Sequence, residues 1–214
     1  RHPLYNNLVQ LKYDQIESQM SERIVQECRG LILDSSNGWN IVARPFDKFF
    51  NYGEGNAAKI DWSTARVQEK LDGSLAVLYH YKGAWHVSTS GTPDASGPVN
   101  GLEFTFNELF WRVFKENGYD IDKVVTGYTY MFELMTPFNR VVVTHKTNRL
   151  VLIGIRDMAT GAEIAPENEI VLHEFCSVKE YKLQTFEDVE TSFKTMNPLD
   201  QEGYVVVDAD FNRV

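Results

Sequence analysis

The sequence predicts an α+β fold in which antiparallel sheets are flanked by a few helices. Short β-rich runs dominate the chain, and turn residues separate several of them, which is typical of hairpins. Helical spacing of apolar residues is found in far fewer places. We see no internal repeat and no low-complexity segment. Strands and helices in these proportions favour sheets with helices packed on their faces.

Two hairpins are expected in the first half of the chain. Residues 30–33 and 39–43 flank the turn-like segment 34–38, and residues 74–81 and 85–90 flank Lys82-Gly83. Further strand candidates lie later in the chain, at residues 128–134, 140–144, 150–156 and 203–207.

The clearest helix candidate covers residues 102–116, and Gly118 follows it as a stop signal. Its apolar side chains recur at helical spacing and are expected to lie in the core: Leu102, Phe106, Leu109, Phe110, Val113 and Phe114. Residues 186–196 form a second, weaker helix candidate.

The composition suits one large domain, or one domain with a small appendage. Hydrophobic residues make up 43% of the 214 residues, which is ample material for a core. No apolar run approaches the roughly 20 residues that span a membrane. The chain begins Arg1-His2-Pro3 without a signal peptide, so we expect a processed or trimmed cytoplasmic chain. Cys28 and Cys176 match no metal spacing and are expected to be buried cytosolic thiols.

The net charge of −9 argues against a protein that binds nucleic acid over its whole surface. It permits a local basic site inside an acidic body. The histidines His80, His86, His145 and His173 suggest neither a zinc site nor a catalytic triad, so we expect structural or surface roles for them.

The sharpest local feature is the segment 69–74, Glu-Lys-Leu-Asp-Gly-Ser, between two apolar runs. A surface lysine in a hairpin turn is one explanation, because Asp-Gly is a common turn dipeptide. A nucleophilic lysine is the other. Its amine must be neutral to attack, through loss of water or a nearby cation.

Three more charged residues interrupt apolar strand candidates. Glu133 lies inside one run, whereas Glu202 and Arg29 lie directly before the first residues of two others. A single charge of this kind is usually a salt bridge or an edge residue. Several of them together with Lys70 indicate one polar site floored by a sheet, because burying charges is costly unless they pair or bind a ligand.

These segments resemble the motifs of the covalent nucleotidyltransferases, namely RNA ligases, DNA ligases and mRNA capping enzymes. Lys70 to Ser74 resembles their Lys-x-Asp-Gly nucleophile motif, and residues 132–134 and 202–206 resemble their third and fourth motifs. Residues 150–157 are similar to the apolar strand after the third motif. The gaps of 63 and 69 residues between Lys70, Glu133 and Glu202 fit the family.

The resemblance extends over residues 10–210 and is closest to the bacteriophage tRNA-repair RNA ligases, because residues 28–33 and 43–51 are similar to that branch's upstream nucleotide-binding region. It implies an ATP-grasp-like nucleotidyltransferase domain over residues 1–214, with two antiparallel sheets enclosing the nucleotide. It also implies an ATP-dependent RNA ligase. Lys70 is expected to take AMP from ATP, pass it to an RNA 5′-phosphate and allow a 3′-hydroxyl to attack that end.

The resemblance assigns roles residue by residue. Lys70 is the catalytic nucleophile, Arg29 lies near the ribose or phosphate, and Lys48 lies near the phosphates. Asp72, Glu133 and Glu202 surround Mg²⁺ (or Mn²⁺) through water molecules. The remaining nucleotide-binding candidates are Tyr13, Phe50, Glu69, Leu71 and Gly73, with Phe50 alternatively a core residue.

Two departures from the family pattern leave alternatives open. Ser90 stands where the branch has a phosphate-contacting lysine, and the last motif, a pair of lysines, is expected just beyond Val214. A GTP-dependent capping guanylyltransferase shares the core motifs, a DNA ligase is disfavoured by residues 43–51, and a non-catalytic sensor of RNA ends or nucleotides is a different class. The expected partner is RNA with 5′-phosphate and 3′-hydroxyl ends, for example tRNA, and further domains beyond Val214.

Overall fold

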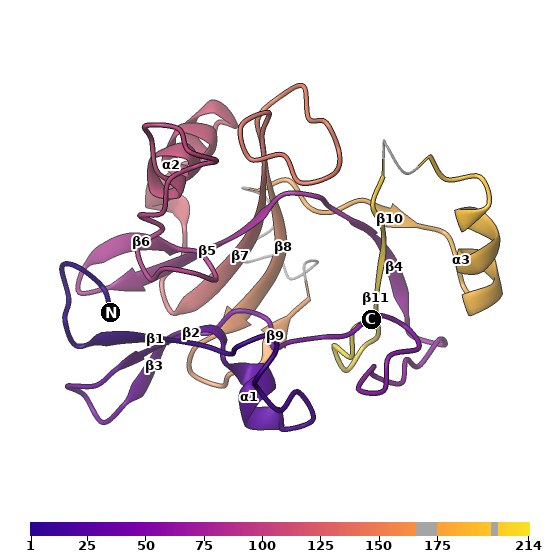
Figure 1. Ribbon diagram of the computed structural model, residues 1–214, viewed down its shortest axis with the longest axis horizontal. Helices are drawn as coiled ribbons and strands as arrows, with labels where there is room; N and C mark the ends of the chain where they lie inside the picture. Colours follow the sequence, from indigo (N-terminus) through magenta and orange to yellow (C-terminus); the bar gives the residue numbers. More distant parts are fainter. Residues whose placement is uncertain (166–174, 198–200) are drawn as a thin grey trace.

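In the computed structural model, which describes residues 1–165, 175–197 and 201–214, the chain forms three antiparallel sheets (Figure 1), and the main hydrophobic core belongs to the largest of them. The largest has five strands in the order β6-β5-β7-β8-β9. Its strands are β5 (Ser74–Tyr81), β6 (Ala84–Ser88), β7 (Tyr128–Met135), β8 (Arg149–Asp157) and β9 (Glu163–Ile164). The expected α+β class with antiparallel sheets is confirmed.

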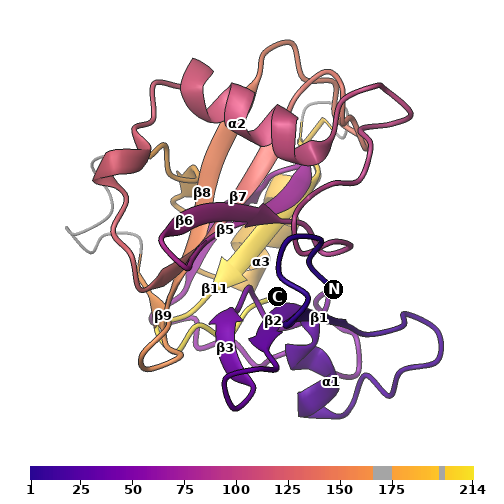
Figure 2. The ribbon, with the colours of Figure 1, turned by 90° about the vertical axis from the view of Figure 1, so that its left-hand side faces the viewer.

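Helix α2 (Phe106–Glu116) lies across one face of the five-stranded sheet (Figure 2). It begins at Phe106 and not at residue 102, because the Thr105 side chain accepts from the backbone of Glu108 and the Glu108 carboxylate accepts from the backbone of Thr105. Its buried residues are Leu109, Phe110, Val113 and Phe114. Leu102, which we expected in the core, is 40% exposed.

A second sheet with the strand order β10-β4-β11 lies on the right in Figure 1, beside helix α3 (Phe186–Phe193). Its strands are β10 (Glu180–Tyr181), β4 (Arg66–Lys70) and β11 (Gly203–Val207). Strand β4 leads directly into β5 of the large sheet, so residues 71–73 join the two sheets. Lys70 is the last residue of β4, which places it at this junction.

The third sheet has the order β1-β2-β3 and contacts the large sheet through a small core of Leu8, Ile32, Ala43 and Tyr79. It contains β1 (Leu8–Lys12), β2 (Arg29–Asp34) and β3 (Asn40–Ala43), with the short helix α1 (Arg23–Glu27) before β2. A 3-10 helix covers Ile121–Lys123. We expected two sheets, and the third was missed because β1 carries no strong alternation.

Two local predictions are wrong. Residues 140–144 do not form a strand, because the backbone N–H groups of Val142 and Val143 donate to the Asp72 carboxylate and not to a neighbouring strand. Cys176 is exposed, whereas Phe175 before it is buried, so the side chains alternate and the thiol faces out. Cys28 is half-buried, and both thiols are free.

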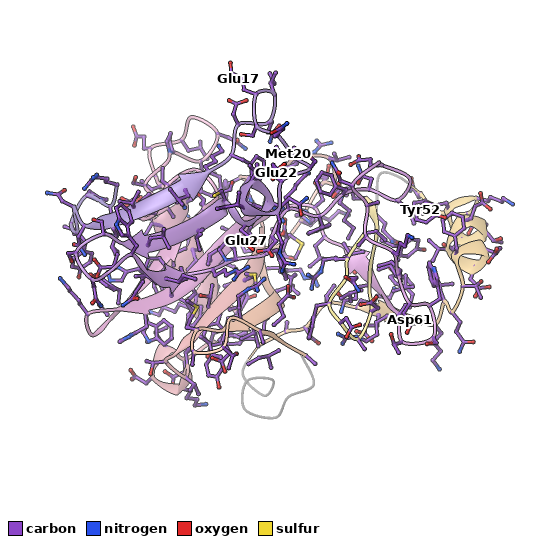
Figure 3. All side chains as sticks on the ribbon, turned by 90° about the horizontal axis from the view of Figure 1, so that it is seen from below. Glu17, Met20, Glu22, Glu27, Tyr52 and Asp61 are labelled. Atoms are coloured by element: carbon purple, nitrogen blue, oxygen red, sulfur yellow. The ribbon has the colours of Figure 1, made fainter. Side chains whose placement is uncertain are left out.

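Helix α3 ends at Phe193, earlier than residue 196, and a turn follows. Tyr52 lies beside this helix (Figure 3), where its ring stacks on Phe186 at 4.2 Å between ring centroids. Among the described residues, no helix is long and apolar enough to cross a membrane. His173 lies outside the described residues.

Candidate active site

A cavity of about 330 Å³, here called the central cavity, opens where the five-stranded sheet meets β4 and β11. Most of the residues singled out from the sequence meet here: Arg29, Glu69, Lys70, Leu71, Asp72, Gly73, Glu133 and Glu202 all line it. They come from β2, β4, the 71–73 junction, β7 and the approach to β11. The expected polar site floored by a sheet is therefore present in the structure.

Lys70 forms an ion pair with Glu202, with 2.6 Å between Lys70 Nζ and Glu202 Oε1. The pair forms because β4 and β11 are antiparallel and Gly203 lies opposite Lys70. The two side chains are 41% and 28% exposed, so ligands reach them from the cavity. A lysine amine attacks only in its neutral form, whereas an ion pair with a carboxylate favours the protonated form.

Glu133 lies in the centre of the large sheet, where β7 pairs it with Leu75 and Val151. Burial raises the pKa of its carboxyl group to about 8. The positive charge of Arg29 acts against this shift, whereas the carboxylates of Glu202 and Asp72 add to it. At neutral pH this shift favours the protonated form of Glu133.

Arg29, the first residue of β2, brings a half-buried cation to the cavity wall. Its Nη1 atom is buried and has no hydrogen-bond partner within the described residues. Burial lowers the pKa of its guanidinium group, while Tyr13 and Glu133 oppose that shift. A buried donor without a partner is costly, so this atom fits an anionic ligand that enters the cavity.

Asp72 holds the loop between β7 and β8 in place. Its Oδ2 accepts from the backbone N–H groups of Val142 at 2.7 Å and Val143 at 2.5 Å. The Nε2 atom of His145 lies 2.5 Å from the carbonyl oxygen of Asp72. A carbonyl only accepts, so Nε2 carries the proton and donates. One carboxylate oxygen of Asp72 is thus committed to the protein itself.

The backbone of Gly73 lies close to β7, and its nucleotide-binding role stays a prediction. A Cβ atom at this position would lie 2.5 Å from the carbonyl oxygen of Leu134 and 2.9 Å from Cγ of Met135. In β4, the backbone N–H of Glu69 donates to the carbonyl oxygen of Lys179 at 2.9 Å.

Three predicted residues do not line the central cavity. Lys48 and Phe50 lie in a neighbouring cavity, where the Lys48 ammonium is 5.2 Å from the Phe50 ring centroid and Phe50 is buried. Tyr13 does not line the central cavity, but its charge acts to raise the pKa of Arg29. Ser90 also lies outside, with its backbone close to Gly30. Their nucleotide-binding roles stay predictions.

Several wall residues were not foreseen. Phe46 and Phe49 line the cavity in place of Phe50, and the ring of Phe49 lies 5.2 Å from the guanidinium of Arg29. Arg213 also lines it, held by a 2.9 Å ion pair to Glu163 and lying 4.3 Å from the Phe46 ring. The aromatic pair was visible in the segment 43–51, but which ring faces the cavity depends on the backbone.

The carboxylates fit a hydrated cation. Among the described residues, no three His, Cys, Asp or Glu side chains are grouped closely enough to bind a metal ion directly. Asp72, Glu133 and Glu202 nevertheless share the cavity, and each of the other two raises the pKa of Glu133. Mg²⁺ usually keeps several of its waters, so this donor set suits a cation held through water molecules.

Comparison with solved structures places the fold among the nucleotidyltransferase-type RNA ligases. A Naegleria gruberi RNA ligase mutant with ATP and Mn matches with a TM-score of 0.50 at 16% identity, over 69% of this chain and 47% of that one. A second mutant of the same enzyme without ligand gives a TM-score of 0.51 at 16% identity and the same coverage. At this identity the likeness establishes the fold alone.

The sequence comparison establishes the family. Residues 27–213 match the family model described as RNA ligase, and the chain belongs to this family. An RNA ligase of Rhodothermus phage RM378 is 35% identical over 179 residues, which cover 67% of this chain and 41% of the relative. A protein of Autographa californica nuclear polyhedrosis virus, described as a candidate bifunctional polynucleotide kinase/RNA ligase, is 30% identical over 95% of this chain and 31% of its own length. The chain thus spans less than half the length of both relatives.

Proposed function

We propose that this chain is the nucleotidyltransferase domain of an ATP-dependent RNA ligase and that Lys70 is its nucleophile. The observation that carries the proposal is the meeting of Lys70, Glu202, Glu133 and Arg29 in one cavity, although they come from different strands of separate sheets. A surface lysine in a hairpin turn does not explain this arrangement. Lys70 ends a strand at a sheet junction, and the cavity that it lines also contains Arg29, whose buried Nη1 has no hydrogen-bond partner among the described residues.

In the first step, Lys70 Nζ attacks the α-phosphorus of ATP. A P–N bond forms, the P–O bond to pyrophosphate breaks, and the amine proton passes to a carboxylate or to water. Attack has to be in line with the leaving pyrophosphate. Glu202 contacts the amine and is the nearest described acceptor for that proton. Arg29 contributes the positive charge that stabilises the phosphate oxygens.

In the second step, an oxygen of the RNA 5′-phosphate attacks the same phosphorus and Lys70 leaves. In the third, the RNA 3′-hydroxyl attacks the activated 5′-phosphorus, a phosphodiester forms, and AMP leaves. The residues near the catalytic lysine therefore have to accept both a nucleotide and an RNA end. We extend the proposal to RNA with 5′-phosphate and 3′-hydroxyl ends, with broken tRNA as one such substrate.

Asp72, Glu133 and Glu202 would hold Mg²⁺ or Mn²⁺ through water molecules. When bound, the cation supplies charge that neutralises the phosphate oxygens. A cation held there would favour the ionised form of Glu133, because its positive charge would offset the cost of ionising a buried carboxyl group. The cytoplasm remains our proposed location, because both described cysteines are free thiols.

The decisive experiment is intact mass spectrometry after incubation with ATP and Mg²⁺. We expect an AMP adduct on the wild-type chain and none on Lys70→Ala or Lys70→Arg, because an arginine stays protonated and cannot attack. Lys115→Ala, an exposed lysine on α2, is the matched control and should be labelled normally.

A labelled Lys70→Ala protein would refute the mechanism. A GMP adduct from GTP in place of the AMP adduct would instead identify a guanylyltransferase. A folded wild-type chain that binds nucleotide and RNA without any adduct would identify a sensor.

A further inference from the structure

A second cavity, of about 260 Å³, also reaches Lys70. It shares one wall with the central cavity, including Lys70, Asp72 and Glu202. The opposite wall is the loop between β7 and β8, which lies at the top of Figure 1. We call residues 140–149, which are the second part of this loop and the first residue of β8, the basic loop. Lys70 therefore stands between the proposed nucleotide site and a cavity that no step of the proposed function has yet used.

The charge of the basic loop is opposite to that of the chain. The net charge of the chain is −9, yet Arg140, Lys146 and Arg149 lie within ten residues that contain no Asp or Glu. Lys146 and Arg149 line the second cavity and are exposed. Within the described ranges neither of them forms an ion pair. Cations left unpaired beside a reactive lysine suit an anionic substrate.

The protein fixes this loop in place before any substrate arrives. Two backbone N–H groups of the loop donate to Asp72 Oδ2, and His145 donates to the Asp72 carbonyl oxygen. These contacts tie the loop to the residue two positions after Lys70. A loop that is already ordered loses less conformational entropy on binding, so its charges are used more effectively.

We propose that the basic loop binds a phosphate group of the RNA strand beside Lys70, through Lys146 and Arg149. This inference rests on the proposed function, because that function brings an RNA phosphate to the AMP carried by Lys70. Pyrophosphate is a less suitable occupant. It is released within the central cavity, which has its own cations, whereas Lys146 and Arg149 are exposed and can follow a longer strand. The basic loop supplies the local positive site that an acidic RNA-binding protein needs.

The test compares Lys146→Gln/Arg149→Gln with Lys59→Gln/Lys115→Gln. Lys59 and Lys115 are exposed outside both cavities, so the control loses the same charge elsewhere. The probes are single-stranded oligoribonucleotides with a 5′-phosphate or a 5′-hydroxyl, titrated by fluorescence anisotropy at several salt concentrations. AMP labelling of Lys70, measured on the same preparations, serves as the internal reference.

We expect the RNA affinity of the loop variant to fall about tenfold while its AMP labelling of Lys70 stays unchanged. The slope of log affinity against log salt concentration should fall in magnitude by about 0.7 for each lost phosphate contact. The control should bind as the wild type does. A loss confined to the 5′-phosphorylated probe places the terminal phosphate at the loop, and an equal loss for both probes places an internal phosphate there.

Three results would overturn the inference: unchanged RNA affinity in the loop variant, an equal loss in the control, or a loss of Lys70 labelling with RNA affinity retained. The last result would assign the loop to nucleotide or pyrophosphate. The proposed function fails separately. If the wild type binds RNA through these cations but never forms the AMP adduct, the ligase mechanism is refuted and the phosphate site stands.

Discussion

Gly73 offers a sharp test of how the catalytic segment is built into the fold. The change Gly73→Ala would place a Cβ atom 2.5 Å from the Leu134 carbonyl oxygen and 2.9 Å from Met135 Cγ. The methionine side chain has room to bend, but the carbonyl does not. It already accepts a 2.7 Å hydrogen bond from Asn139 Nδ2, and Leu134 pairs with strands on both sides.

The expected cost follows from this rigid neighbour. Adding a methyl group to a tightly packed site typically costs about 1–3 kcal/mol. Replacing a glycine also restricts the unfolded chain, which returns about 0.4–1 kcal/mol where the native backbone permits it. The free energy of unfolding should therefore fall by roughly 1–2 kcal/mol, which lowers Tm by about 2–8 °C in a domain of this size.

The same change should impair chemistry. The backbone of Gly73 acts to lower the pKa of Glu133, and residue 133 immediately precedes Leu134. A shift of β7 away from the new methyl group moves Glu133 relative to Lys70, so AMP labelling should slow even in the folded fraction. Urea denaturation measures the stability, and intact mass against time measures the labelling.

Gly55→Ala is the matched control for this prediction. Its Cβ atom would meet no heavy atom within 4 Å, and its φ is not positive. This variant should be as stable as the wild type or slightly more stable, with normal labelling. If Gly73→Ala unfolds within about 0.5 kcal/mol of Gly55→Ala and labels normally, the close approach seen between Gly73 and β7 does not constrain the protein.

Two further predictions concern the charged groups of the central cavity. Without divalent cations, the free energy of unfolding should decrease as pH rises from about 4.5 to about 8, because the folded pKa of Glu133 is raised and its protonated form favours the folded state. Glu133→Gln should flatten this profile in urea titrations at pH 5, 6.5 and 8, and an unchanged profile would contradict the raised pKa. Arg29→Met should weaken ATP binding about tenfold or more, yet leave the protein as stable or make it more stable, because it removes a cation whose buried Nη1 has no hydrogen-bond partner in the described part of the chain. Isothermal titration and thermal unfolding check this, and a loss of several kcal/mol with normal ATP affinity would make Arg29 a structural residue.

The sequence was sufficient for the strands whose apolar pattern is strong. Residues 203–207 and 74–81 match β11 and β5 without adjustment. It was insufficient for β4, which reads Arg-Val-Gln-Glu-Lys and looks too polar for a strand. Its Val67 and Gln68 are nevertheless buried between β10 and β11. Pairing with strands far along the chain, and not local composition, decides the structure there.

The same distinction applies to the cavity. Charged residues inside apolar runs could be found from the sequence because their burial has to be explained, and Glu133 and Arg29 both line the cavity. The positions of Phe49 and Arg213 in the cavity wall could not be found from the sequence. Arg213 stands in the polar stretch Asp-Phe-Asn-Arg near Val214, and Glu163, which holds it, lies 50 residues earlier in the chain. Interactions of this range appear only once the chain is folded.

The segment from Lys70 to Ser74 now has two physical tasks, and this explains its composition better than either task alone. Lys70 faces the cavities, while Asp72 fixes the basic loop and Gly73 lets β5 lie close to β7. The proposed nucleophile is thereby held by the same segment that orders the proposed RNA site. A substitution at Asp72 should consequently affect nucleotide and RNA together, whereas Lys146 and Arg149 should affect RNA alone. If the two phenotypes differ in this way, the basic loop and the central cavity are distinct sites that one motif joins.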